Sequence, residues 1–342
     1  MINEQLKNVF LSGKDNFEDI LGQENVKSQL KSALLMDRHI LIVGPPGIGK
    51  TTLAKNVAKL LPDIEVVSDC SFHCDPKKPL CPECLSKKGL KAKKIKGAER
   101  FIRIQGSPDL TAEDLLGDID PIKALQYGPL SMQAFTPGKI FKANRGVLFF
   151  DELNRCPEKL QNALLQVLSE RKATLGSYEV DIEADFIFIA TMNPEDSSTE
   201  KLSDVLLDRF DIVYMGYPED ISIEMQIVKE KGKKVVDFDD ELLQLAISFV
   251  RLLRDDEKVE KKPSVRASLG LYERAQGNAV LARRKKVTFD DIKNSIVSVL
   301  SHRVELKASV KYLKSAKEYI AEEFKKFSKK FEPEESEEGE VP

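Results

Sequence analysis

The sequence lacks a long hydrophobic run. None of its 342 residues falls in an apolar stretch that approaches the ~20 residues a membrane-spanning helix needs. The first segment, MINEQLKNVFLSGKDNFED, also lacks the hydrophobic core of a secretory signal. We therefore expect a soluble chain without membrane insertion, with the cytoplasm as its default compartment.

An excess of charge of one sign is also missing. Lysine and arginine number 53, aspartate and glutamate number 56, and the formal net charge is −3. This balance argues against a dedicated nucleic-acid-binding protein, although local basic runs remain. A chain of this length favours two domains over one and can bury a sizeable core, and it shows no internal repeat.

Cysteine is scarce, yet four of the five cysteines lie within CSFHCDPKKPLCPEC (70–84). In a reducing compartment, clustered thiols are more often metal ligands than disulfides. The cluster is a metal site that does chemistry, a metal site that holds a loop together, or a coincidence, and the choice depends on the rest of the chain.

Short apolar runs alternate with helical patterns up to residue 218, which predicts an α/β domain with a parallel sheet sandwiched by helices. The runs are nearly continuous, as expected for strands buried on both faces. A helix is expected over 157–171, and alternation around Gly176-Ser177 predicts a β-hairpin over 172–185. The expected strands are 39–43, 101–104, 146–150, 185–190 and 211–215.

Only helical patterns follow, which predicts a smaller all-helical domain over 219–305. Thr288 is the expected N-cap of its last helix. A charged helix is expected over 306–331, and the acidic tail 332–342, with six glutamates and no basic residue, is expected to be disordered.

The segment GPPGIGKTT (44–52) fits G-x-x-x-x-G-K-[ST] and stands between an expected strand and helix, which predicts a nucleoside-triphosphate site. Its glycines let backbone N–H groups surround phosphates, and the helix N-terminus favours the same anion. Lys50 would reach the β- and γ-phosphates and Thr51 would bind Mg²⁺. The expected binding residues are Gly44, Pro45, Pro46, Gly47, Ile48, Gly49, Lys50, Thr51 and Thr52.

A second apolar strand, in GVLFFDE (146–152), ends in two carboxylates. Asp151 would hold the Mg²⁺ shell and Glu152 would polarise the attacking water. The alternative is that both acids only cap the following helix. Together with the phosphate loop, the pair predicts hydrolysis of ATP.

The order of these motifs resembles that of AAA+ ATPases, and DELNRCPEKLQNALLQVLSER (151–171) is similar to the MoxR and magnesium-chelatase I-subunit group. The resemblance covers about 17–300. It implies sensor 1 at ATMNPED with Asn193, an arginine finger in LLDRFD with Arg209, and a lid sensor in PSVRASL with Arg266. FEDILGQENVK (17–27) resembles the segment that lines the adenine pocket.

Each of these side chains also has a simpler interpretation. Arg209 and Arg266 could be solvated or weakly paired surface residues, and Asn193 could cap a turn before Pro194. A catalytic role has a clear physical basis, because guanidinium groups stabilise the spread negative charge of phosphoryl transfer. A finger supplied to a neighbouring subunit requires a ring, expected to be a hexamer, or at least a dimer.

Two further insertions resemble those of the group. Residues 104–146 are similar to a loop inserted into the second core helix, which in these families projects toward the pore and acts on the client. The hairpin at 172–185 resembles the insertion before sensor 1. Both could instead be inert surface loops, although long ordered insertions are more often functional.

The cysteine insertion spans about 68–98. Its spacing, C-x3-C-x6-C-x2-C, and its stiffening prolines favour a closed structural zinc site, while an iron–sulfur cluster or free or redox thiols stay open. His73 is expected to be a neighbour rather than a ligand, and Cys156 a small residue at a helix start. The expected ligands are Cys70, Cys74, Cys81 and Cys84.

A run of six lysines without an acid follows at 87–97. It is either a solvated loop or a contact for nucleic acid, an acidic partner or the acidic tail. Without interleaved aromatic residues it is weak evidence for base stacking.

The resemblance implies an ATP-driven ring that works with a partner carrying a von Willebrand A domain. Such a ring would remodel or activate a protein client in a chaperone-like way, as the MoxR likeness suggests, or drive metal insertion, as the chelatase likeness suggests. The alternative is a DNA-associated motor of the helicase or branch-migration kind. A nucleotide switch that hydrolyses little is disfavoured by Glu152, Asn193 and Arg209.

Overall fold

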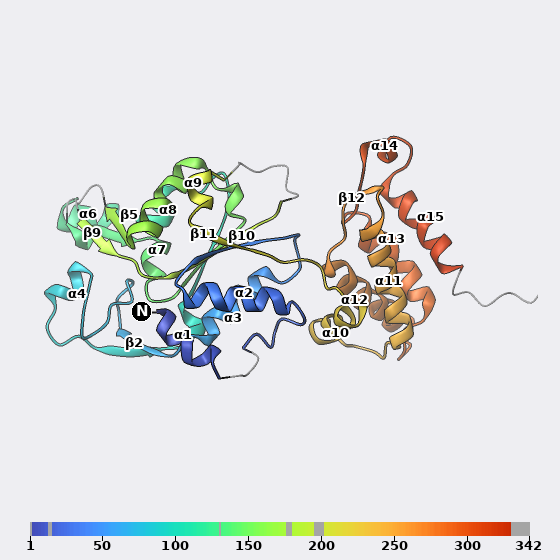
Figure 1. Ribbon diagram of the computed structural model, residues 1–342, viewed down its shortest axis with the longest axis horizontal. Helices are drawn as coiled ribbons and strands as arrows, with labels where there is room; N and C mark the ends of the chain where they lie inside the picture. The colour runs from blue at the N-terminus through green and yellow to red at the C-terminus, as the bar shows by residue number, and fades with distance from the viewer. Residues whose placement is uncertain (1, 13–15, 130, 176–179, 195–201, 330–342) are drawn as a thin grey trace, which may run out of the picture. The chain divides into compact units, whose positions relative to one another are not determined.

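The computed structural model describes residues 2–12, 16–129, 131–175, 180–194 and 202–329 (Figure 1). The chain divides into two compact units. One comprises Met1–Pro45 and Gly49–Gly216, and is called here the ATPase unit. The other comprises Pro46–Ile48 and Tyr217–Pro342, and is called the helical unit.

A five-stranded parallel sheet forms the centre of the ATPase unit, with the order β11-β1-β10-β7-β4. This confirms the predicted α/β class. The strands are nearly fully buried because apolar residues occupy both of their faces. Their bounds are β1 His39–Val43, β4 Phe101–Gln105, β7 Val147–Asp151, β10 Ile187–Met192 and β11 Phe210–Tyr214.

Helices cover both faces of the sheet. Figure 1 shows α2 (Glu24–Leu35) and α3 (Lys50–Leu60) on one face and α8 (Glu158–Glu170) on the other. Each buries a stripe of aliphatic side chains, such as Leu160 and Leu164 of α8, against the strands. The sequence pattern did not predict two short helices: α1 (Ile2–Phe10), which contacts α2, and α9 (Asp204–Leu207), which contacts α8.

The cysteine insertion folds on an antiparallel pair, β2 (Ile64–Val67) with β3 (Ala92–Ile95), and carries the short helix α4 (Pro82–Ser86). The 3-10 turn η1 (Gly97–Arg100) then leads into β4. Arg100 is buried there and donates to the carbonyls of Pro62, at 2.7 Å, and Arg145, at 2.6 Å. Burial lowers the pKa of its guanidinium to about 10.

The 104–146 insertion is an ordered subdomain around a second antiparallel pair, β5 (Gly117–Ile119) with β6 (Phe135–Pro137). Gly117 has φ 114°, and a Cβ there would lie 2.3 Å from the carbonyl oxygen of Thr136, so the turn into β5 requires glycine. The remaining elements are α5 (Ala112–Leu116), α6 (Pro121–Tyr127), η2 (Met132–Ala134) and α7 (Lys139–Lys142).

The hairpin expected over 172–185 is present as β8 (Lys172–Leu175) and β9 (Val180–Glu183), which pair antiparallel. Its expected tip, Gly176-Ser177, lies outside the described residues. The 3-10 turn η3 (Leu153–Arg155) connects β7 to α8.

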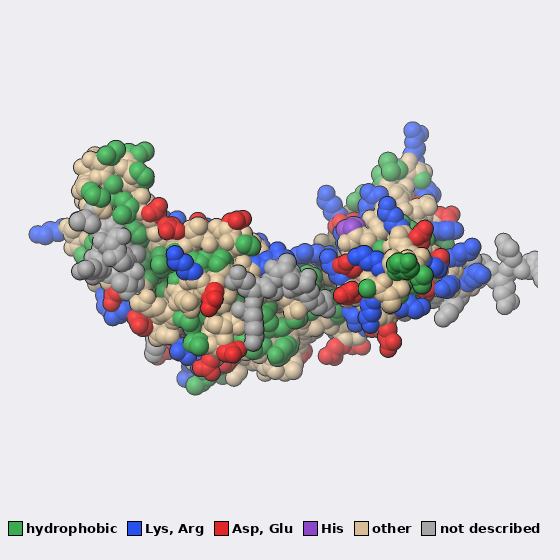
Figure 2. All heavy atoms as spheres, turned by 90° about the horizontal axis from the view of Figure 1, so that it is seen from above, with side chains coloured by type: hydrophobic (Ala, Val, Ile, Leu, Met, Phe, Trp, Pro, Cys, Tyr) green, Lys and Arg blue, Asp and Glu red, His purple; other side chains and the backbone are tan. Residues whose placement is uncertain are grey.

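The helical unit is built from α10 (Ile221–Lys231), α11 (Asp240–Asp255), α12 (Val265–Leu281), α13 (Phe289–Leu300) and α15 (Ala316–Ser328). Most of these helices share a core around Phe249, Leu271, Ile296 and Phe324. Two short strands, β12 (Val259–Lys261) and β13 (Glu305–Leu306), pair antiparallel beside it. Figure 2 shows Lys and Arg side chains mixed with Asp and Glu over this unit.

One expectation for this unit is confirmed and one is corrected. Thr288 caps α13 in a capping box with Asp291, as expected. The single charged helix expected over 306–331 is instead two helices, α14 (Ala308–Lys311) and α15, because Ser315 begins a new helix in a capping box with Glu318. The acidic tail lies outside the described residues. Among those described, no helix is long and apolar enough to cross a membrane.

Candidate functional site

The phosphate-loop motif lies between β1 and α3, as its sequence context requires. Gly47 and Gly49 have φ of 76° and 104°, a left-handed conformation that glycine adopts without strain. Gly44 N–H donates to the carbonyl of Met192 at 3.1 Å, which fixes the start of the loop to the end of β10. The Lys50 ammonium folds over the loop and donates to the carbonyl oxygens of Gly44 and of Pro45.

Asp151 is the last residue of β7, and its carboxylate is held from the two neighbouring strands. Thr191 Oγ1 in β10 donates to Oδ1 at 2.7 Å. Arg103 Nη2 in β4 donates to Oδ2 at 2.6 Å. Both oxygens of the carboxylate therefore already have a partner, and a magnesium ion at this position would compete with Arg103 for Asp151.

The backbone of Glu152 adopts a left-handed conformation, with φ 57° and ψ 53°. Its N–H donates to Thr191 Oγ1 at 3.0 Å, and its carboxylate accepts from Gln105 Nε2 at 2.8 Å and pairs with Arg155 at 3.2 Å. It makes no side-chain cap to η3. The Asp151 carboxylate thus faces the neighbouring strands, and the Glu152 carboxylate binds Gln105 of β4 and Arg155 of η3 without capping the turn.

Asn193 directly follows β10, beside the start of the phosphate loop, because Val43 pairs with Met192 in the sheet. Its carbonyl oxygen accepts from Asn154 Nδ2 at 3.3 Å. The carboxyl ends of β1, β10 and β7 therefore bring Gly44, Asn193 and the two acids to one edge of the sheet, called here the nucleotide edge.

Arg103, Gln105 and Thr191 were not among the residues expected from the sequence. All three contact the acidic pair from strands that flank β7. The sequence did contain a pattern that indicates them. Arg103 and Gln105 alternate with the apolar Ile102 and Ile104 along β4, so both point to one face of the strand, and Gln105 pairs with Asp151 in the sheet. Alternation alone did not show which face would meet the acids.

The segment expected to line the adenine pocket packs close to the phosphate loop. A Cβ on Gly49 would lie 3.6 Å from Ile20 and from Met215. Gln23 Nε2 donates to the carbonyl of Gly216 at 3.0 Å. Residues 17–27 thus lie beside the start of α3.

Arg209 lies at the opposite edge of the sheet. It immediately precedes β11, and the amino ends of β11 and β1 pair as Phe210 with His39. Its Nε donates to Ser169 Oγ at 3.1 Å, Nη1 pairs with Asp208 at 3.3 Å, and its side chain is 41% exposed. It lines a polar pocket of about 460 Å³ together with Asp37, Arg38, His39, Leu168, Ser169, Arg171 and Asp208.

Arg266 is the second residue of α12 in the helical unit, and its N–H donates to the N-cap Ser264 Oγ at 3.3 Å. A buried network fixes this helix start. Arg254 Nε donates to the carbonyl of Pro263 at 2.7 Å, and its other nitrogens bind both oxygens of the fully buried Glu224 at 2.6 and 2.7 Å. Burial, with the nearby positive charge of Arg266, lowers the pKa of Arg303.

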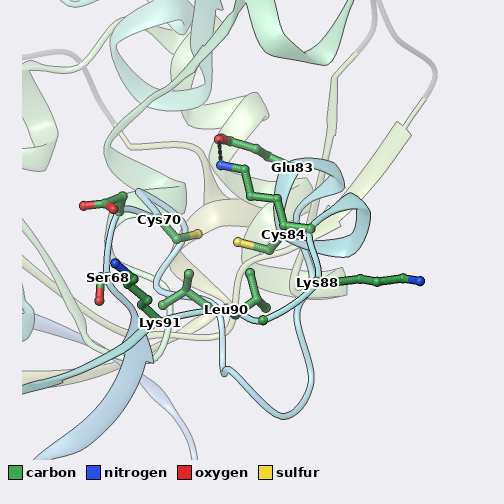
Figure 3. A pocket seen from close by; sticks show the side chains of 11 residues that line it. Ser68, Cys70, Glu83, Cys84, Lys88, Leu90 and Lys91 are labelled. Carbon is green, nitrogen blue, oxygen red and sulfur yellow. Dashed lines mark hydrogen bonds and ion pairs between the residues drawn. The ribbon is translucent and has the colours of Figure 1, made fainter.

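The four clustered cysteines meet, and their sulfur atoms all lie within 4.8 Å of one another. Figure 3 shows the sulfur atoms of Cys70 and Cys84 facing each other beside a pocket of about 210 Å³. All five cysteines are thiols rather than disulfides. His73 Nδ1 is buried without a hydrogen-bond partner, and the His73 ring is not part of the sulfur cluster.

Backbone N–H groups point at the cluster. Leu80 and Cys81 donate to Cys74 Sγ, each at 3.3 Å, and Cys84 donates to Cys81 Sγ at 3.4 Å. Hydrogen bonds from the Cys74 and Cys81 thiols lower the pKa of Cys70, whereas burial raises the pKa of Cys84. A compact set of four sulfur donors with N–H···S bonds fits a thiolate-bound metal such as zinc.

The lysine run does not form a uniform basic surface. Lys87 pairs with Glu83 at 2.5 Å and Lys94 with Asp63 at 3.4 Å, and Figure 3 shows Lys88 pointing away from the pocket. Cys156 is buried outside the sulfur cluster, next to Pro157, the N-cap of α8. The 104–146 insertion exposes apolar side chains on α6, with Ile122 78% and Leu125 91% exposed.

A phosphate loop after β1, an acidic pair at the end of β7 and an asparagine after β10 of a 5-stranded β11-β1-β10-β7-β4 sheet define an AAA+ ATPase. Three family models match: "ATPase family associated with various cellular activities" at 87–212, "Magnesium chelatase, subunit ChlI" at 16–71 and "AAA lid domain" at 253–322. The chain belongs to the magnesium-chelatase subunit I-like family of AAA+ ATPases.

The relatives support this family over most of the chain. A magnesium-chelatase subunit ChlI homolog of Methanocaldococcus jannaschii is 29% identical over 320 residues, covering 85% of this chain and 86% of the relative. The chloroplastic subunit ChlI-2 of Arabidopsis thaliana is 30% identical, covering 84% and 75%. A chain in the cryo-EM complex of BchI and BchD of magnesium chelatase shares the fold, with TM-score 0.51 at 21% identity over 89% of this chain and 98% of that one.

Proposed function

We propose that this ATPase works as a ring in which each nucleotide site is completed by the neighbouring copy. The observation that carries this proposal is the position of Arg209. It precedes β11, whereas Gly44 and the acids follow β1 and β7, so the arginine and the nucleotide edge stand at opposite ends of parallel strands. Five strand residues separate the two edges by roughly 15 Å, too far for the guanidinium to reach its own chain's phosphates.

Within one copy, the chain's own residues divide the work. Lys50 and the loop's N–H groups bind the phosphates, and Thr51 and Asp151 would hold Mg²⁺, which neutralises charge on the phosphate oxygens. Glu152 orients and polarises the attacking water, with Asn193 beside it. The Thr191 hydroxyl donates to the Asp151 carboxylate and accepts from the backbone N–H of Glu152, so it links the two residues.

Arg103 and Gln105 set the resting state of the acids in this mechanism. Arg103 neutralises Asp151, and Gln105 holds the carboxylate of Glu152 at 2.8 Å. Both contacts would have to loosen for Asp151 to hold Mg²⁺ and for the Glu152 carboxylate to reach the water. Arg209 of the adjacent copy and Arg266 of the helical unit would then stabilise the transferring phosphoryl group.

The ring, as a hexamer, would act on a protein client or drive metal insertion together with a von Willebrand A-domain partner. Support comes from the relatives, which are named as magnesium-chelatase subunits, and from the fold shared with a chain in a complex of BchI and BchD. Exposed Ile122 and Leu125 give the 104–146 insertion an apolar surface that suits a protein contact.

A DNA-associated motor receives less support, because two lysines of the 87–97 run are already ion-paired. Adding single-stranded DNA should therefore leave turnover unchanged. Stimulation with a steep salt dependence would favour the DNA motor instead.

The cysteine insertion would hold one structural zinc ion. Four sulfur atoms within 4.8 Å supply a complete tetrahedral donor set, which leaves no position for a reacting water. Elemental analysis of protein purified under reducing, chelator-free conditions should give one zinc per chain. Less than about half a zinc per chain, or stoichiometric iron with sulfide, would contradict this assignment.

Mixing two inactive variants tests the shared site. Glu152→Gln removes the water-polarising group and Arg209→Ala removes the finger, so each variant alone should be inactive. In a mixture, some interfaces combine an intact Glu152 with a neighbour's intact Arg209, about a quarter of them at random. Turnover should reappear on mixing. Full turnover by a strictly monomeric protein, or a mixture as inactive as its components, would contradict the proposal.

A further inference from the structure

The cysteine loop packs against residues 135–146 of the 104–146 insertion, which comprise β6, α7 and the residues that lead into β7 and are called here the returning arm. Phe72 lies between Cys70 and Cys74 in the sequence, and its ring lies 5.2 Å from that of Phe141 in α7. Phe141 in turn lies 6.1 Å from Phe135 in β6. All three rings are buried. The loop is therefore continuous with the apolar core of the insertion.

Polar contacts fix the same loop to the residues that lead into β7. Asn144 Nδ2 donates to the carbonyl of Phe72 at 2.9 Å, and Asn144 Oδ1 accepts from the N–H of Asp185 at 3.1 Å. Arg145 Nη1 donates to the carbonyl of His73 at 3.4 Å, and its Nη2 pairs with Asp75 at 3.3 Å. These anchors come just before the strand that ends at Asp151.

The cysteines themselves belong to this core. Cys74, Cys81 and Cys84 are buried in the cluster that contains Leu115 of α5 and Phe135, with Met132 of η2 packed against it. The helix α4, which carries Cys84, contacts η2. Of the insertion's elements, η2 therefore contacts the cysteine-bearing helix α4, and α5 and β6 share one buried core with the cysteines.

We infer that the metal-bound cysteine loop is the base that holds the returning arm of the 104–146 insertion in place beside β7. The inference rests on the proposed zinc site. Between Cys70 and Cys84, regular structure is limited to the isolated bridge of Asp75 with Lys78 and the start of α4, so four ligand bonds would supply much of the order of this loop. Phe72 and Asn144 are the positioning residues: the Phe72 ring packs against the arm, and the Asn144 side chain binds the Phe72 carbonyl.

Hydrogen exchange of the full chain in three states tests the inference. The states are zinc-loaded wild type, wild type stripped of zinc by a chelator, and zinc-loaded Phe72→Ala. In both altered states, peptides within 112–146 should exchange about tenfold faster, a local loss of ~1.4 kcal/mol. Peptides of α3 should stay protected, and the affinity for a fluorescent ATP analogue should change little.

Phe72→Ala separates the inference from the zinc site, because its side chain binds no metal. This variant should keep one zinc per chain while the arm loosens. Phe324→Ala is the matched control: Phe324 is also buried among aromatic rings, but in the helical unit. It should leave exchange within 112–146 unchanged.

Two results would overturn the inference. One is unchanged exchange of the arm in zinc-free protein that remains folded. The other is an unchanged arm in Phe72→Ala with zinc bound, which would leave the zinc site standing and remove only its proposed role. A protein that binds no zinc fails the elemental analysis first, so the two failures are distinguishable.

Discussion

The nucleotide edge and the cysteine cluster reach their geometry by different routes. Asp151 and Asn193 are 42 residues apart in the chain, and they meet because parallel strands end at a shared edge. The four cysteines lie within 15 consecutive residues, and their loop has little regular structure of its own. The first site is therefore preorganised by the fold, whereas the second would need its ion to be held together.

The largest expected effect is on turnover at the nucleotide edge. Glu152→Gln keeps the hydrogen-bonding shape of the side chain but removes the charge that polarises water, so ATP hydrolysis should fall by at least about 10²-fold. ATP binding and zinc content should persist. Steady-state turnover, nucleotide affinity and elemental analysis check all three.

Glu170→Gln, an exposed change at the end of α8, is the control and should hydrolyse ATP like the wild type. Normal turnover in Glu152→Gln would remove the catalytic assignment of this glutamate. Loss of zinc in the same variant would show that the two sites depend on each other more than their geometry implies.

Changes at the cysteine cluster should act on stability first. Cys74→Ser removes one of four buried sulfur ligands, so zinc should be lost and the midpoint of thermal unfolding of the ATPase unit should fall by about 10 °C. At temperatures below the lowered midpoint, Cys74→Ser should still bind ATP, since the phosphate loop shares no residue with the cysteine cluster. Calorimetry and zinc analysis measure both quantities.

Cys156→Ser provides the matched comparison, because Cys156 is equally buried but lies outside the sulfur cluster. It should keep zinc and lose only about 1 kcal/mol, the cost of placing a hydroxyl in an apolar site. If Cys74→Ser and Cys156→Ser lowered the free energy of unfolding equally, burial, and not metal binding, would explain why cysteine occupies these positions.

The predictions from sequence succeeded where a pattern is local. Five apolar runs marked the strands, and the acids after one run marked its carboxyl end, so the α/β class followed from the sequence. The pairs β2–β3 and β5–β6 were not predicted, because strands such as Ala92–Ile95 are short and polar. The contact of Phe72 with Phe141 was out of reach, because 69 residues separate them and no periodicity links them.

A smaller effect separates two ion pairs at opposite edges of the sheet, in which the arginines are equally exposed and the acids are 15% (Asp151) and 41% (Asp211) exposed. Arg103 pairs with Asp151 at 2.6 Å and Arg38 pairs with Asp211 at 2.9 Å. Removing Arg103 frees a proposed magnesium ligand, so Arg103→Ala should lower the Mg²⁺ concentration needed for half-maximal ATP-analogue binding. Exposed pairs contribute about 0.2–1 kcal/mol, so the shift should be at most about fivefold.

Arg38→Ala removes a similar pair from the other edge and should leave the magnesium requirement unchanged. Fluorescence titrations with Mg²⁺ at fixed nucleotide compare the two variants. A shift of equal size in both would show that total charge, and not the contact with Asp151, sets the magnesium affinity.

The smallest expected effect is a pH dependence at the Arg209 edge. Burial lowers the pKa of His39 below 6.5, and His39 Nε2 lies 3.1 Å from the carbonyl of Leu168. Because the folded state resists protonation, the stability contributed by neutral His39 is complete above pH 6.5 and is lost as the pH falls below it. The hydrogen bond with Leu168 and the negative charge of Asp37 raise the pKa of His39, whereas the positive charges of Arg171 and Arg38 lower it further.

His39→Gln keeps a donor for the Leu168 carbonyl but cannot titrate. Urea unfolding at pH 7 and pH 5 should therefore show a smaller loss of stability in this variant than in the wild type, while carboxylates that titrate in both proteins cancel in the comparison. An identical loss in the two proteins would assign the acid sensitivity to other groups. Zinc release at pH 5 would add a further loss, and repeating the titration with Cys74→Ser removes that contribution and isolates the edge that carries Arg209.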